Sequence, residues 1–346
     1  MLKEGEVQPR SEPSFVGKVL IAGTVLALLL AAWWVAQVLL IGFGGIVVAV
    51  ALNNIARPLA QRTGVSEHVA LALTTIGLVI LVFGFLGMFG AGASAQFGAL
   101  FDSLPTAWEA FRAWLGKWAL GRQILEGVES QTGQAATAMI SALPFASAIV
   151  SGIANALLIL VIGIYLAADS ASYSNGALRL LPMSKRVRAH EIMLASAVNL
   201  RRWLAAMTLD MLFLGIISGV GLWLVGVPFA FALGVLSGLS VFVPYIGPIV
   251  ATVPGLLLAL SVSPELALYA AGVYVVAQQL EGNISLPLLQ RWTVHMPPVV
   301  SLLAMIAFGL LFGLWGVLLA TPMTVVAQTI IRMAYVEDVL EKRHPG

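Results

Sequence analysis

Long apolar stretches, separated by short polar segments, run along the whole chain. The first covers residues 19–52, and others cover about 69–93, 146–168 and most of 207–336. A backbone in lipid must satisfy its own hydrogen bonds, so apolar runs of this length predict membrane-spanning helices. The pattern therefore predicts an all-α polytopic membrane protein with about six full spans.

The first apolar stretch is too long for one crossing. As a single helix it would extend about 51 Å, against a hydrocarbon core of roughly 30 Å. We expect the chain to turn near Gly42, Gly44 and Gly45. Residues 1–18 then form a polar, uncleaved tail, and residues 19–93 form the N-terminal membrane helices.

Residues 94–145 have a different pattern, in which bulky apolar residues recur every three or four positions. This spacing predicts an amphipathic helical region, with one helix opening after Asp102 or Ser103 and Pro105 in its first turn. A face rich in Trp and Phe either lies in the bilayer interface or packs against the protein's own helices. The pattern leaves both interpretations open.

Charge sets the expected orientation of the helices. Residues 169–206, predicted to be a helical loop, hold six basic and two acidic residues, whereas 94–145 hold three basic and four acidic ones. Cytoplasmic loops of membrane proteins are enriched in Lys and Arg. We therefore expect 169–206 in the cytoplasm, 94–145 outside, a membrane helix at 146–168 between them, and both tails (1–18 and 337–346) in the cytoplasm.

The region 207–336 is predicted to be a transport core, and it contains a broken apolar stretch at 229–262. Pro244 and Pro248 flank Tyr245 and Gly247 in its middle, and two prolines four apart interrupt a helix. Each arm has about 15 residues, or roughly 22 Å, which is short for a full crossing. The pattern predicts a re-entrant hairpin with freed backbone groups at its tip.

A second broken stretch lies at 297–331, interrupted at Gly313, Trp315 and Gly316. A predicted span at 266–279 separates the two hairpins. Counting crossings, the first hairpin enters from outside and the second from the cytoplasm. Such an inverted repeat is typical of transporters whose broken helices meet at mid-membrane. Trp315 is equally explained as an interface anchor.

Few polar side chains lie near these hairpins, and they are the candidate ligands for a small polar solute or a monovalent cation. Gln278 and Glu281 share a helix face, with Asn283 close behind. Glu281 and Asp210 are the possible coupling carboxylates. The alternatives are a helix-end residue in headgroup water for Glu281 and an ion-paired or helix-start carboxylate for Asp210.

Composition narrows the function classes. Of the 346 residues 60% are hydrophobic and only 10% charged, with a mean hydropathy of +0.98, which excludes a soluble domain. The net charge of +2, clustered by loop, argues against a nucleic-acid partner, and the absence of cysteine excludes disulfides and thiolate chemistry. No His lies in a predicted span, so we expect neither a metal nor another cofactor and no enzyme. An intramembrane enzyme, a membrane scaffold and a channel are the competing classes.

Several motifs resemble those of the autoinducer-2 exporter (AI-2E) family of bacterial transporters. They are Val243-Pro-Tyr-Ile-Gly-Pro248, Gln278-Gln-Leu-Glu-Gly-Asn283 with Pro287, and Gly313-Leu-Trp-Gly316 followed by Ala320-Thr-Pro322. The resemblance implies a transporter of the bacterial inner membrane with an elevator-like movement of the hairpins. It also implies a homo-oligomer, a pentamer in some members. The expected cargo is autoinducer-2, or sodium or lithium exchanged for protons.

Overall fold

Every element of the computed structural model is helical in the residues that it describes, which are 15–88, 90–118, 122, 142–244, 246–291 and 297–341. The helices are α1 (Phe15–Thr63), α2 (Glu67–Met88), α3 (Gly90–Leu115), α6 (Ala142–Ala168), α7 (Ser170–Arg179), α8 (Met183–Leu224), α9 (Ala230–Ser240), α10 (Ile246–Val262), α11 (Pro264–Leu280), α12 (Leu286–Gln290) and α13 (Pro298–Ile331), with π-helices η1 (Glu281–Ser285) and η2 (Arg332–Leu340). The all-α prediction is confirmed over these ranges.

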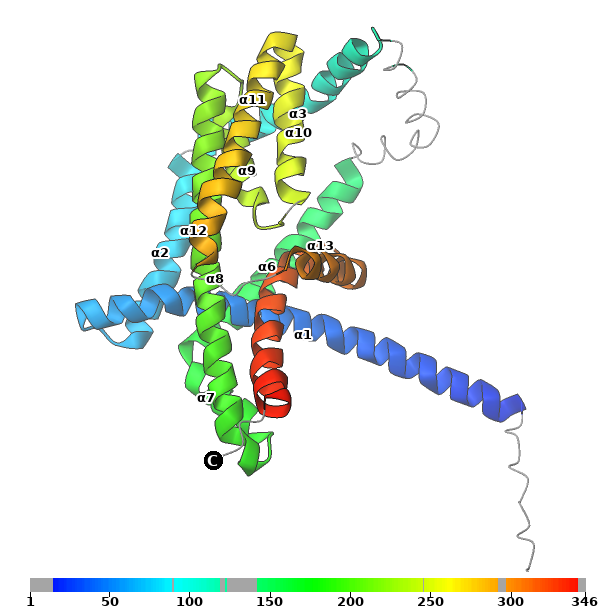
Figure 1. The fold of residues 1–346 in the computed structure, drawn as a ribbon, viewed down its shortest axis with the longest axis vertical. Helices are drawn as coiled ribbons and strands as arrows, with labels where there is room; N and C mark the ends of the chain where they lie inside the picture. Colours follow the sequence, from blue (N-terminus) through cyan, green and yellow to red (C-terminus); the bar gives the residue numbers. More distant parts are fainter. Residues whose placement is uncertain are drawn as a thin grey trace, which may run out of the picture.

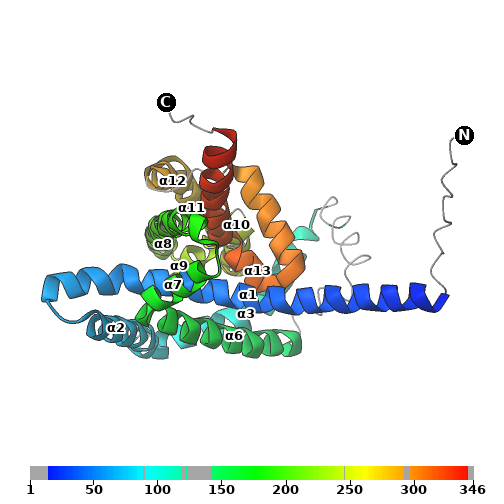
Figure 2. The same ribbon diagram turned by 90° about the horizontal axis from the view of Figure 1, so that it is seen from below.

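The helices form two groups that share α1 (Figures 1 and 2). In one, α2 and α6 pack on α1. In the other, α9 and α11 pack on α8, and α10 packs on α9, α11 and α3. The C-terminal helix α13 packs on α8 and on α1. The transport-core region therefore rests on one long helix, α8.

The turn expected near Gly42 is wrong, because α1 is continuous from Phe15 to Thr63. Its glycines serve packing instead. A Cβ on Gly45 would overlap Ile162 of α6, and one on Gly163 of α6 would overlap Val48 of α1. Small residues of this kind let two helix backbones approach closely in a membrane protein.

The helix expected to open near Asp102 begins earlier than predicted. Helix α3 starts at Gly90 and passes through Pro105, which lies inside it. On its buried side Ala107 is fully enclosed against the cluster formed by α8, α9, α10 and α11. This contact favours packing against the protein's own helices for that part of the 94–145 region; residues 119–121 and 123–141 lie outside the described residues.

Three helical segments in the described part of the chain are long and apolar enough to cross a membrane: Val35–Thr63, Met183–Leu224 and Pro298–Leu340. The pair α6 and α7, bent by 88° at Asp169, adds a fourth if it is taken as one span. The predicted count of six spans is not confirmed. One reason is that the fifth predicted span is the second half of α8, which continues without a break from the basic segment before it.

The first predicted hairpin appears as two separate helices. Helix α9 descends beside α8, the chain reverses after α9, where residues 241–244 are not helical, and α10 ascends in contact with α9 (Figure 1). A Cβ on Gly247, in the first turn of α10, would overlap the carbonyl of Ser240 at the end of α9. The two arms are therefore in backbone contact at the tip.

The second predicted hairpin is α13, whose two halves meet at Gly313. This residue has φ 62° and ψ −143°, a conformation that is essentially restricted to glycine. A Cβ on Gly316 would overlap the carbonyl of Phe308, so the half that follows the break folds back close to the half that precedes it. Figure 2 shows the resulting bend between the orange and the red halves.

Two pairs of glycines hold α9 against α8. On α8 Gly215 and Gly219 face Gly234 and Gly238 on α9, each pair four residues apart. A Cβ on Gly234 would lie 2.6 Å from the Cα of Gly219. The contact is backbone against backbone, which leaves no flexible side chain to move aside.

We therefore expect Gly234→Ala to lower the thermal unfolding midpoint of the detergent-solubilised protein, at a cost of about 1–3 kcal/mol for overpacking. Gly272→Ala in α11 is the matched control, because its Cβ meets nothing within 4 Å. Both substitutions gain the same intrinsic helix propensity. Equal midpoints for the two variants would contradict the close contact.

The C-terminal π-helix is tied to the start of α8 by Arg188. Its guanidinium lies 3.0 Å from Glu337 and 2.9 Å from Asp338 of η2, and it also donates to the carbonyl of Met333. A further hydrogen bond of 3.0 Å joins Asn199 of α8 to Thr329 of α13. The second half of α13 is therefore fixed to α8 along its length.

Candidate transport site

The two helix breaks come together beside α8. Phe242 lies in the break between α9 and α10, and Trp315 lies two residues after Gly313. Both belong to one apolar cluster, which is built around Leu200 and Trp203 of α8. The rings of Trp203 and Phe242 meet edge to face, 5.9 Å apart. The two helix breaks, about 70 positions apart in the sequence, therefore lie beside the same stretch of α8.

A buried carboxyl group lies at this level of α8. Asp210 is 3% exposed and accepts a hydrogen bond from the hydroxyl of Ser285 in η1. Its neighbours Met207 and Met211 pack, with Leu214, against Val241 at the first hairpin tip. Charged groups buried in membrane helices are costly, so a carboxyl here is a functional candidate by default.

Glu281 is the second carboxyl group at this place. It is the first residue of η1, half-buried, and close enough to Asp210 for the two charges to repel each other. Single π-helical turns inside longer helices are frequent at functional sites. Here the π-helix brings Glu281 and Ser285 to the same side as Asp210.

The other predicted residues divide into two sets. Pro248 and Gln278 line one small cavity beside the first hairpin, and the carbonyl of Pro244 accepts a 2.8 Å hydrogen bond from Ile246. By contrast, Asn283 is exposed and its amide bonds Gln279, at 2.9 Å to the carbonyl oxygen and 3.0 Å to the side chain. Asn283 thus stands apart from the carboxyl pair.

The remaining predictions concern the hairpin tips themselves. Gly247 and Gly316 are buried at backbone contacts, Trp315 is half-buried in the cluster around Trp203, and Gly313 is exposed at its break. Tyr245 lies outside the described residues.

Sequence reasoning missed Ser285 and four further polar residues: Ser218, Ser237, Thr252 and Tyr274, all of which line the cavity next to Pro248. A signal for some of them was available. Ser218 follows Asp210 by two helical turns, and Tyr274 precedes Glu281 by two, so each shares a face with a carboxyl group. In apolar sequence this spacing marks a continuous polar face.

A second hollow on the described surface lies elsewhere. It is an apolar groove of about 590 Å³ along the outer side of α8 and α9, bordered by the contact glycines and by Trp223 and Phe231. Such a lining suits lipid chains and offers a polar solute nothing to bind. The polar candidates are not among the residues that line this groove.

Apolar helices interrupted by non-helical backbone beside buried polar groups define a class, the polytopic membrane proteins that transport solutes. Comparison with known protein families identifies the family within this class. The model of the "AI-2E family transporter" matches residues 23–335, so the chain belongs to the AI-2E transporters. The expected resemblance and the assignment to membrane transport are confirmed.

Curated relatives carry names of the same kind. "Putative transport protein YueF" of Bacillus subtilis (strain 168) is 26% identical over 278 residues, which cover 74% of each chain. YrrI of the same organism is 34% identical over 152 residues, 44% of this chain and 43% of its own. YhhT of Escherichia coli (strain K12) is 33% identical over 127 residues, 36% of each chain. This chain therefore matches less than half the length of YrrI and of YhhT.

Proposed function

We propose that the protein carries a small polar solute of the autoinducer-2 kind across the bacterial inner membrane by alternating access, with an elevator-like movement of its broken-helix region. The observation that supports this most strongly is the convergence of the two helix breaks, at residues 241–244 and at Gly313, on the stretch of α8 that carries Asp210. A protein with a purely structural role has no need of non-helical backbone at that place.

In this proposal the two hairpins enter from opposite sides of the membrane and form an inverted repeat, with both termini in the cytoplasm. Gly247 holds the two arms of the first hairpin together at its tip. The exposed break at Gly313 supplies free backbone groups, and Gln278 with Glu281 supplies oxygens to the solute. The backbone groups and the Gln278 amide orient a hydroxylated solute, and the Glu281 carboxylate accepts hydrogen bonds from its hydroxyl groups. A homo-oligomer in the bilayer is the expected assembly.

A second candidate is a sodium- or lithium-for-proton antiporter on the same fold. The buried Asp210 beside the half-buried Glu281 favours it, because two neighbouring carboxyl groups bind either a cation or a proton. No group of three His, Cys, Asp or Glu residues that could hold a metal ion occurs among the described residues.

Purified protein in proteoliposomes tests both candidates. Uptake of labelled autoinducer-2 would be compared with sodium-driven proton movement in the same vesicles and in protein-free vesicles. Solute uptake that needs no sodium supports the first candidate, and proton movement that needs sodium or lithium supports the second. Neither activity, in protein shown to be folded, would contradict both.

Glu281→Gln is expected to lower the transport rate by at least about 10-fold in either case, because the carboxylate is the charged oxygen ligand next to the first hairpin and each 1.4 kcal/mol of lost stabilisation is tenfold. Glu265→Gln is the control, since Glu265 is exposed in the first turn of α11. Equal rates for both variants would remove Glu281 from the site.

A further inference from the structure

An apolar groove of about 590 Å³ follows the line along which α8 and α9 meet. Four glycines lie in it, Gly215 and Gly219 of α8 and Gly234 and Gly238 of α9. Because glycine has no side chain, the surface stays hollow where the two helices touch. The rim carries exposed apolar side chains, which are Leu212, Ile216, Val220 and Trp223 from α8 and Leu239 from α9. The groove therefore faces outward from the pair of helices.

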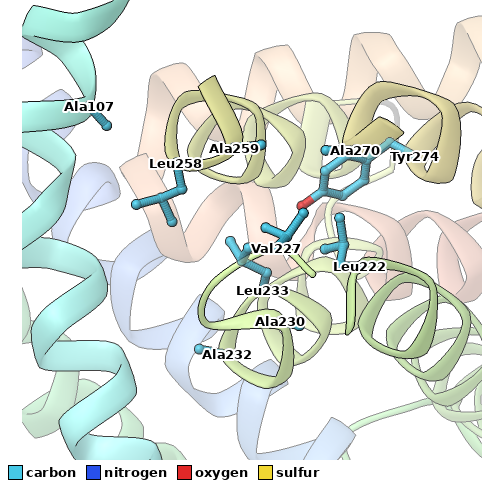
Figure 3. Close-up of a cluster of buried hydrophobic side chains, with 10 residues drawn as sticks. All are labelled: Ala107, Leu222, Val227, Ala230, Ala232, Leu233, Leu258, Ala259, Ala270 and Tyr274. Atoms are coloured by element: carbon cyan, nitrogen blue, oxygen red, sulfur yellow. The ribbon is translucent and has the colours of Figure 1, made fainter. Parts of the chain in front are cut away.

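Helix α9 presents apolar residues on two faces. Figure 3 shows Ala230 and Leu233 in the buried cluster that α9 shares with α8, α10 and α11. Val235 and Leu239, which are four residues apart, lie on the opposite face and line the groove. The apolar lining of the groove is therefore a second face of α9, separate from the one that is buried inside the protein.

The lining offers an occupant almost no hydrogen bonds. None of the described residues that line the groove is charged, and apart from the Trp223 indole the only polar side chain is that of Thr208. The Thr208 hydroxyl donates to the carbonyl of Leu204 in its own helix, at 2.9 Å. The groove runs along a helix that is apolar and long enough to cross a membrane. A hydrocarbon chain fits this lining, because a polar occupant would lose its hydrogen bonds to water.

An arginine lies beyond one end of the groove, on the same face of α8. Arg201 precedes Thr208 by seven residues, which is two helical turns or roughly 10 Å along the axis. Its side chain is partly buried, and its enclosed Nε has no hydrogen-bond partner among the described residues. The arginine ion pairs in the described part of the chain belong to other residues, namely Arg112, Arg188 and Arg332. A partly buried guanidinium with no carboxylate beside it indicates an anionic partner.

We propose that an anionic phospholipid occupies this site, with its phosphate on Arg201 and one acyl chain in the groove. The planar guanidinium suits a phosphate, to which it donates paired hydrogen bonds. Glycerol and ester groups separate the phosphate of a lipid from its acyl chains, as two helical turns separate Arg201 from the groove. The exposed Arg202 beside it adds a second positive charge, which favours an anionic headgroup over a zwitterionic one.

The lipid contacts two parts of the molecule at once. Its headgroup is held by α8, whereas its chain lies against both α8 and α9, the first arm of the first hairpin. Separation of α9 from α8 would leave the chain without one wall. The lipid and the contact between Gly219 and Gly234 therefore stabilise the same position of this arm, whatever solute the protein carries.

Native mass spectrometry of the full-length, detergent-solubilised protein tests the headgroup. Phosphatidylglycerol and phosphatidylcholine with the same acyl chains are titrated in turn, and the affinities for the first bound lipid are compared. The parent should bind phosphatidylglycerol at least about 10-fold more tightly, and Arg201→Gln should lose that preference. Arg179→Gln, which removes the same charge from the exposed surface of α7, is the control and should keep it. Equal affinities of the parent for the two lipids, or the same preference in both variants, would overturn the proposal.

A second pair of variants tests the groove in the same titrations. Thr208→Trp places a large side chain at the end of the groove nearest Arg201, so it should weaken the binding of both lipids. Leu209→Trp is the matched control, because Leu209 is exposed at the next position of α8 and does not line the groove. Equal lipid binding by the two variants would overturn the groove as the site of the acyl chain. A lipid-free dimer that Thr208→Trp separates into monomers would instead assign the groove to a second copy of the chain.

Discussion

Replacing Gly313 with alanine should abolish transport while the protein still inserts into the membrane. At φ 62° and ψ −143° an alanine is strained by about 1–3 kcal/mol, although its Cβ would meet nothing within 4 Å. The effect is therefore conformational: α13 relieves the strain by changing the angle between its two halves. Trp315 then leaves its place beside Trp203, and the second helix break no longer faces the first.

The control is Gly309→Ala, in the same helix one turn before the break. Its Cβ would meet only the end of the Val317 side chain, which is able to rotate away. Flux into proteoliposomes should be near that of the parent for Gly309→Ala and absent for Gly313→Ala. Equal flux for the two variants would show that the break at Gly313 has no role in transport.

Replacing Asp210 with asparagine should have the second large effect. Asparagine keeps the shape and still accepts a hydrogen bond from Ser285, so the fold is expected to remain intact. It removes a buried carboxyl group, 3% exposed, whose neighbours on α8 pack against Val241. If this group carries a proton or faces a cation during transport, flux should fall by at least about 100-fold, the lower range for removal of a proton-transferring group.

Ser285→Ala separates this role from simple packing. It removes the hydrogen bond to Asp210 and keeps the carboxyl group, so transport should persist with a changed pH profile. A purely structural Asp210 predicts the opposite order, with Ser285→Ala more harmful than Asp210→Asn, because asparagine keeps the hydrogen bond that Ser285→Ala removes. Transport that is unchanged in Asp210→Asn would exclude a coupling role for this residue.

The arms of the first hairpin were predictable from sequence because proline acts locally. Pro244 and Pro248 prevent one helix from running through 229–262, and the observed arms end and begin at Ser240 and Ile246. The helix expected at 266–279 agrees with α11, since Ser263 caps it and Pro264 starts it, whereas its crossing of the membrane stays a prediction. The placement of both hairpins in a membrane remains a prediction.

Glycine was harder to interpret. In α1 the expected turn is absent, because Gly45 is there for its contact with Gly163 and Ile162, more than 100 positions away. In α13 a similar glycine, Gly313, does break the helix. The difference depends on which distant helix lies opposite, and a local pattern does not contain that information.

The polar lining of the site was only partly predictable for a related reason. Charged residues are conspicuous in apolar sequence, so Asp210 and Glu281 were found. Ser218, Thr252 and Ser285 are common in membrane helices, where they bond their own backbone and carry no distinct signal. Only the packing of α11 against α8 and α10, and of η1 against α8, brings them to the candidate site.

Side-specific labelling of single cysteines tests the central claim most directly, that two helix breaks facing one site open in turn to opposite sides of the membrane. The chain has no cysteine, so Ile246→Cys and Leu314→Cys each introduce a unique thiol at an exposed position next to a break. The account predicts that an impermeant thiol reagent reaches Ile246→Cys from outside and Leu314→Cys from the cytoplasm, and that transport conditions change both rates. Labelling of both from the same side under every condition would contradict it.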